Sequence, residues 1–76
     1  MTRFTYIDVN IDRIKQDIKM GIVSTTVLYH WEIYSRFDYY KKAGKTVSDA
    51  VFYASEDFSI DVSWMFKIKS QMEKDI

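Results

Sequence analysis

The stretch AVFYASEDFSIDVSWMFKIK, residues 50–69, decides the expected fold, because two helical patterns meet in it across a short polar break. After the break, Met65, Ile68 and Met72 recur at the spacing of one helix face. We expect Ser59 to occupy the break, in a turn that requires a residue tolerant of positive φ, and Asp61 to cap the helix that follows. The stretch therefore predicts two helices packed across a tight turn.

Two further helices are expected before this pair. Residues 10–21 carry isoleucines on one face, with Asn10 or Asp8 as the cap and Gly21 as the left-handed exit. A longer helix runs from a Ser24 cap to a stop at Gly44, and one broad apolar face is expected along it.

The third expected helix, residues 46–58, begins with the capping-box spacing Thr46-x-x-Asp49. The first stretch, RFTYIDV at residues 3–9, mixes aromatic and β-branched residues, so we expect a short extended N-terminal arm. Together these features predict an all-α, compact four-helix domain spanning residues 1–76. The residues at the centres of its four inner faces are Ile14, Ile18, Trp31, Phe37, Val51, Ala54, Met65 and Ile68.

Composition excludes several kinds of protein. The chain has 76 residues, which is the length of one small domain. It has no cysteine and therefore no disulfide, and its lack of proline and its two glycines favour helices with few breaks. No apolar run approaches the ~20 residues of a membrane span, and we expect a cytoplasmic protein. The formal net charge is zero, so no global charge attracts nucleic acid.

Residues 50–69 resemble the helix-turn-helix family of DNA-binding proteins, with Ser55 as the small contact residue and Ser59 in the turn. That family usually has alanine and glycine at these two positions. The whole chain is similar in size and style to small helix-turn-helix proteins of bacterial phages and mobile elements. A rival pair of helices spans residues 17–32, with Gly21 in the turn and Ile22 and Val27 in the locking positions. It ranks second because Gln16 and Asp17 are polar where the first helix should be apolar and small.

The resemblance implies transcription control or phage DNA handling, with duplex DNA read from the outer face of the second helix. On that face we expect contacts from Val62, Ser63, Phe66, Lys67 and Ser70. A cationic cluster at the end of the long helix would hold phosphates, and an arm residue would enter a minor groove. These residues are Arg36, Lys41, Lys42 and Lys45 for the cluster, and Arg3 for the arm.

An alternative is a helical protein-interaction module, an adaptor or inhibitor that does not bind DNA. Residues 46–66 contain no lysine or arginine, and the carboxylates of Glu56 and Asp57 near the turn oppose phosphate. Phe52 and Phe66 are predicted on outer faces, where a protein partner would suit them. The high aromatic content, with Tyr39 also predicted outward, indicates a homodimer.

Enzymatic chemistry is not indicated. His30 is the only histidine, and its place beside Trp31 is typical of a partly buried residue rather than a catalytic base. No nucleophile motif, phosphate loop or metal-ligand spacing occurs, so we expect no cofactor and no metal.

Overall fold

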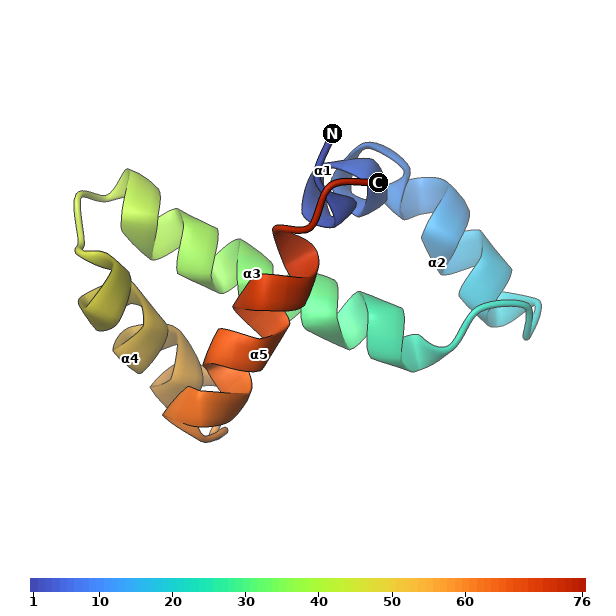
Figure 1. Ribbon diagram of the computed structural model, residues 1–76. Coiled ribbons are helices and arrows are strands. Elements are labelled where there is room, and N and C mark those ends of the chain that lie inside the picture. Colours follow the sequence, from blue (N-terminus) through green and yellow to red (C-terminus); the bar gives the residue numbers. More distant parts are fainter.

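A long central helix, α3, organises the fold, because it contacts each of the other four helices. The computed structural model describes residues 1–76. In Figure 1, α4 extends from one end of α3, α5 crosses over its middle, and α1 and α2 lie toward its other end. The helices are α1 (Arg3–Val9), α2 (Ile11–Lys19), α3 (Thr25–Lys42), α4 (Val47–Asp57) and α5 (Val62–Met72).

The long helix and the helix after it begin at the predicted caps. The Ser24 hydroxyl accepts a hydrogen bond of 3.2 Å from the Thr26 amide, and the Thr46 hydroxyl accepts one of 3.2 Å from the Asp49 amide. Each bond satisfies an amide that has no partner within its own helix. The polar residues in the sequence therefore place the starts of α3 and α4.

The predicted helix ends are also confirmed where glycine follows the helix. Gly21 and Gly44 have φ angles of 76° and 93°, the left-handed exits expected after α2 and α3. The other two expected caps are correct in position only. Asn10 and Asp61 precede α2 and α5, but neither side chain makes a capping hydrogen bond.

The core forms where α3, α4 and α5 converge, and α1 and α2 add one buried isoleucine each. Six of the eight predicted core residues are buried, whereas Trp31 and Ile18 are wrong, since they pack only at the edge of the core. The apolar residues with exposed fractions of 9% or less are Ile7, Ile14, Ile33, Tyr34, Phe37, Ala50, Val51, Ala54, Met65, Ile68 and Met72.

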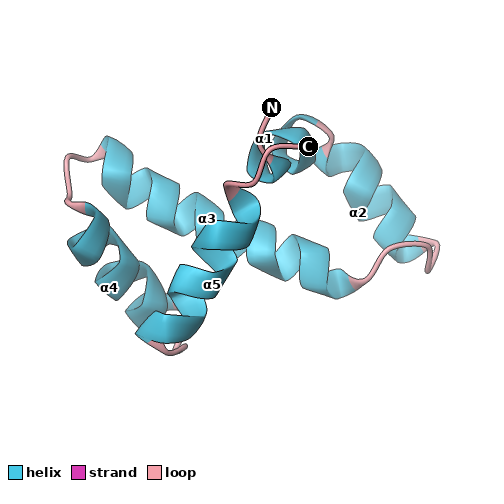
Figure 2. Cartoon of the chain, viewed as in Figure 1, coloured by secondary structure: helices cyan, strands magenta, loops and turns pink.

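The predicted N-terminal arm is wrong, because residues 3–9 form a helix rather than an extended segment. The chain therefore has five helices in place of four, joined by the short connections seen in Figure 2. Helix α1 begins at a Thr2 cap, buries Ile7, and stacks Phe4 on Tyr34 with ring centroids 4.5 Å apart. A helix of seven residues is unstable alone, so these tertiary contacts fold it.

The two ends of the chain meet beside α1. Thr2 and Asp75 form an isolated antiparallel bridge, in which the Arg3 amide donates to the Lys74 carbonyl at 2.7 Å. Figure 1 shows the N- and C-termini close together at the top of the molecule. This pairing fixes the start of α1 against the residues that follow α5.

Candidate nucleic-acid interface

The turn between α4 and α5 has the predicted strained residue at its centre. Ser59 has a φ of 54°, and it is the only residue other than glycine with positive φ. Its amide donates to the Glu56 carbonyl at 3.1 Å, and the Ile60 amide donates to the Ser55 carbonyl at 3.0 Å. These backbone bonds close α4 and redirect the chain into α5.

The small residue expected at the helix contact is in place. Ser55 is 3% exposed, and its hydroxyl donates a hydrogen bond of 2.7 Å to the Phe52 carbonyl within α4. A polar group that is buried must find such a partner, and here it finds one locally. The serine side chain is therefore almost as small as alanine, and its burial does not carry the free-energy cost of an unpaired hydroxyl.

The rival pair of helices is less well packed. Its turn glycine, Gly21, does have positive φ, but of its two locking residues Ile22 is 68% exposed and Val27 is only partly buried. In the α4–α5 pair, the corresponding apolar residues Met65 and Ile68 are 0% and 1% exposed.

Helix α5 presents the predicted outer face to solvent. Val62 and Phe66 are 42% and 45% exposed, and Ser63, Lys67 and Ser70 are also exposed. Residues 62–72 include two lysines and no carboxylate. This face therefore offers hydroxyls, an ammonium group and apolar surface, with no acidic residue of its own helix among them.

The predicted phosphate cluster is partly neutralised by neighbouring acids. Arg36 lies 3.4 Å from Asp57, and Lys42 forms an ion pair of 2.8 Å with Asp38, which raises the pKa of Lys42. Glu32 precedes Arg36 by one helical turn, but the two form no ion pair, and the guanidinium contacts Asp57 instead. Only two lysines of the cluster lack an acidic partner.

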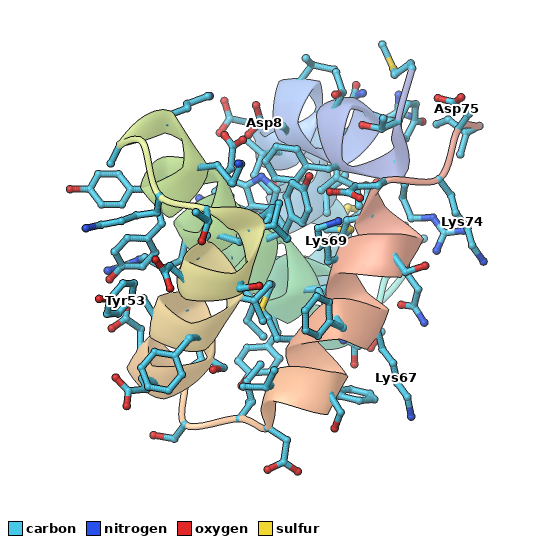
Figure 3. The ribbon with its side chains drawn as sticks, turned by 60° about the vertical axis from the view of Figure 1, so that its left-hand side comes forward. Asp8, Tyr53, Lys67, Lys69, Lys74 and Asp75 are labelled. Carbon is cyan, nitrogen blue, oxygen red and sulfur yellow. The ribbon has the colours of Figure 1, made fainter.

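Those two lysines are held by other groups near the end of α3. The Lys41 ammonium donates to the Lys45 carbonyl at 3.3 Å, and the Lys45 ammonium lies 5.7 Å from the centroid of the Tyr53 ring. Figure 3 places Tyr53 on the opposite side of the molecule from Lys67. The structure therefore does not join the cluster to the outer face of α5.

A different set of cations lies beside α5. Figure 3 shows Lys67 and Lys74 extending outward on the same side, while Lys69 lies inward, where it pairs with Glu73 at 2.8 Å. The Arg3 side chain is exposed, and its backbone is bonded to Lys74, so α1 and not a free arm carries it to this region. Sequence reasoning missed Lys74, whose proximity to Arg3 depends on the pairing of the chain ends.

Of the two acids near the turn, Glu56 and Asp57, the second has a structural role. The Asp57 carboxylate accepts a hydrogen bond of 2.7 Å from the Tyr40 hydroxyl in addition to its contact with Arg36. These interactions compensate its charge, and the hydrogen bond to Asp57 is the main cause that raises the pKa of the Tyr40 hydroxyl. Glu56 has no such partner, so it is the acid that would oppose phosphate near the turn.

The single histidine is part of an aromatic cluster. The His30 ring lies 6.2 Å from the Trp64 ring and 6.5 Å from the Tyr29 ring, measured between centroids. Burial lowers the pKa of His30 because it disfavours the charged imidazolium. Lys67 lies 6.0 Å from the centroid of the Trp64 ring, so this cluster continues to the exposed face of α5.

Comparisons with known proteins identify no relative: no family model matches the chain, and no significant match occurs among curated proteins or solved structures. Among the five helices, none is both long and apolar enough to cross a lipid bilayer.

Proposed function

We propose that the protein is a small helix-turn-helix DNA-binding protein acting in transcription control or in the DNA handling of a phage or mobile element, with α5 as its recognition helix. The observation that carries the proposal is the turn at Ser59. A helix pair joined through a residue with φ of 54°, with Ser55 buried, supports the proposal, because a tight turn and a small contact residue are two features of such a motif.

The chemistry of α5 supports the same function. Ser63, Lys67 and Ser70 can donate hydrogen bonds to base edges, and exposed apolar groups such as Phe66 can contact a thymine methyl group. Lys74 and Arg3, beside the end of α5, supply cations for phosphates on the flank of the same face. We assign them the anchoring role in preference to Arg36 and Lys42, whose charges are already paired.

Titration of random-sequence duplex DNA at two salt concentrations tests this function. We expect affinity to fall as salt rises, because phosphate contacts release counterions. Lys67→Ala and Lys74→Ala should each flatten the salt dependence by about one unit of slope per lost phosphate contact. Lys19→Ala is the matched control, because Lys19 is exposed on α2, which does not contact α5.

Two further variants separate base contacts from electrostatic effects. If Lys67 contacts a base edge, its loss should also cost about 1–3 kcal/mol at one preferred base pair. Glu56→Gln should tighten binding, because it removes the uncompensated carboxylate beside the turn. Absence of binding even at low salt would reject the DNA function.

The second candidate is a protein-interaction module that uses the Phe66 side of α5. Phe66, Val62 and Phe52 are each more than two-fifths exposed, on two helices that pack together. In this case, Phe66→Ala should abolish binding to the protein partner, while Lys67→Ala should change it little. The two candidates therefore make opposite predictions for neighbouring residues.

A further inference from the structure

A groove on α3 lies outside the proposed DNA surface. It has a volume of about 610 Å³ and is lined by Trp31, Glu32, Ser35, Arg36, Tyr39 and Phe58. Five of these residues occupy one stripe of α3, whereas the buried residues of that helix, Ile33, Tyr34 and Phe37, lie on the opposite side. Phe58, from the end of α4, forms one wall.

Two polar groups in this groove have no partner within the chain. The Ser35 hydroxyl oxygen is buried and makes no hydrogen bond. The Glu32 carboxylate makes neither an ion pair nor a hydrogen bond, although Arg36 follows it by one helical turn. The Glu32 side chain is exposed, so its carboxylate is free to contact a cation of another molecule.

We propose that the groove is a self-association surface, in which α3 of a second copy lies antiparallel to α3 across a two-fold axis near Ser35. The charges of the stripe complement themselves in this arrangement. An axis at residue 34 brings Glu32 of each copy opposite Arg36 of the other. The Arg36 side chain is 49% exposed beside Asp57, so its guanidinium can contact this second carboxylate as well, and one symmetric contact forms two ion pairs. A parallel arrangement would instead bring identical charges together.

The shape of the stripe fits the same partner. Ser35 lies close to the axis, where a small side chain permits close approach of two helices. Trp31 and Tyr39 lie on either side of Ser35 along the stripe, and Tyr39 is 63% exposed in the single chain. The pairing covers this aromatic surface. Because the formal net charge is zero, no overall repulsion opposes the association of two copies.

The pairing leaves α5 accessible. Helix α5 packs on the side of α3 that carries Ile33, Tyr34 and Phe37, and the groove is on the other side. Two copies joined through the groove therefore direct their α5 helices away from each other. In combination with the proposed DNA function, on which this one consequence rests, the pair would join two duplex segments rather than read successive grooves of one.

Charge reversal with sedimentation tests the surface. We expect the natural protein to form a dimer at micromolar concentration, and Glu32→Arg to raise the dimer dissociation constant at least ~10-fold, because two attractive contacts become repulsive. Arg36→Glu should do the same. A mixture of the two variants should restore the dimer as a heterodimer, because each of the two contacts then joins an arginine of one variant to a glutamate of the other.

Controls separate this effect from misfolding and from association elsewhere. Glu32 has no contact to lose, so Glu32→Arg should melt as a diluted natural protein does, whereas Arg36→Glu also loses its contact with Asp57. Asp12→Arg, on the exposed surface of α2, should leave the dimer unchanged. A natural protein that sediments as a monomer at ~100 µM, far above the micromolar range expected of a specific pair, would overturn the proposal. So would a Glu32→Arg variant as dimeric as the natural chain. Neither result would bear on DNA binding by the single chain.

Discussion

The Tyr34 hydroxyl donates a hydrogen bond of 2.9 Å to the Glu73 carboxylate, which joins the middle of α3 to the residue that ends α5. Lys69 pairs with the same carboxylate at 2.8 Å, and its ammonium lies 5.8 Å from the centroid of the Phe37 ring. A small network of one phenol, one carboxylate and one ammonium therefore fastens α5 beside the helix bundle core.

Tyr34→Phe should lower the free energy of unfolding by about 1–2 kcal/mol, because it removes a hydrogen bond to a charged group and keeps the aromatic ring. Chemical denaturation monitored by circular dichroism measures the difference. Tyr6→Phe is the control, since the Tyr6 ring is 48% exposed and its hydroxyl makes no hydrogen bond. Equal stabilities of the two variants would show that the network contributes nothing.

Stability should rise with pH in the range just below the usual histidine pKa of about 6.5. Burial lowers the pKa of His30 in the folded chain, so in this range the unfolded chain binds more protons than the folded one. Acidification through this window therefore favours unfolding. His30→Gln should flatten the dependence between about pH 5.5 and 7, and an unchanged slope in that variant would assign the effect to the carboxylates.

Ser59→Gly should raise stability by up to about 1 kcal/mol, since glycine adopts a φ of 54° without the steric cost that serine meets there. Part of the gain is offset because glycine makes the unfolded chain more flexible. Ser48→Gly, in the first turn of α4, is the control and should not stabilise. Thermal melting of both variants gives the comparison, and destabilisation by Ser59→Gly would contradict the account of the turn.

Two neighbouring residues of α5 should respond very differently to truncation. Ile68 is 1% exposed, so Ile68→Ala should cost about 2–5 kcal/mol through lost burial and the cavity left behind. Phe66 is 45% exposed, and Phe66→Ala should cost roughly 1 kcal/mol or less. Denaturant unfolding of the two variants distinguishes them, and similar losses would mean that the buried face of α5 is misassigned.

Ser35→Ala should leave a monomeric sample as stable as before or stabilise it by up to about 1 kcal/mol, because it removes a buried hydroxyl that has no partner in the chain. Ser55→Ala offers a matched comparison in α4, where the hydroxyl does have a partner at 2.7 Å. The measurement is the difference between the two variants in dilute solution. A larger loss at Ser35 than at Ser55 would contradict the assignment.

Local chemistry made α2, α3 and α4 predictable, because serine and threonine caps begin α3 and α4 and the two glycines end α2 and α3. Helix α5 was predictable from the helical spacing of its buried residues Met65, Ile68 and Met72. Helix α1 was not, because aromatic and β-branched residues favour an extended chain and only its contacts with Tyr34 and the chain end make residues 3–9 helical. A pattern read from neighbouring residues carries no information about partners that are distant in the sequence.

The same limit explains which core residues were misjudged. Helix α3 has aromatic residues on several sides, so spacing alone could not tell that Trp31 belongs to the groove and Tyr34 to the core. In the candidate site, the positions of Ser59 and of the exposed face of α5 followed from the sequence. The pairing of Arg36 with Asp57, and the placing of Arg3 beside Lys74, required the tertiary structure.

The bridge between Thr2 and Asp75 has a consequence for the order of folding. Helices α3, α4 and α5 are sequence neighbours, so their mutual contacts close short loops, whereas α1 reaches its site only when almost the whole chain has closed. We therefore expect the three-helix unit to form early and α1 to dock last. In the folded molecule, the amides of α1 should exchange with solvent before those of α4, through an opening that leaves the rest of the chain intact.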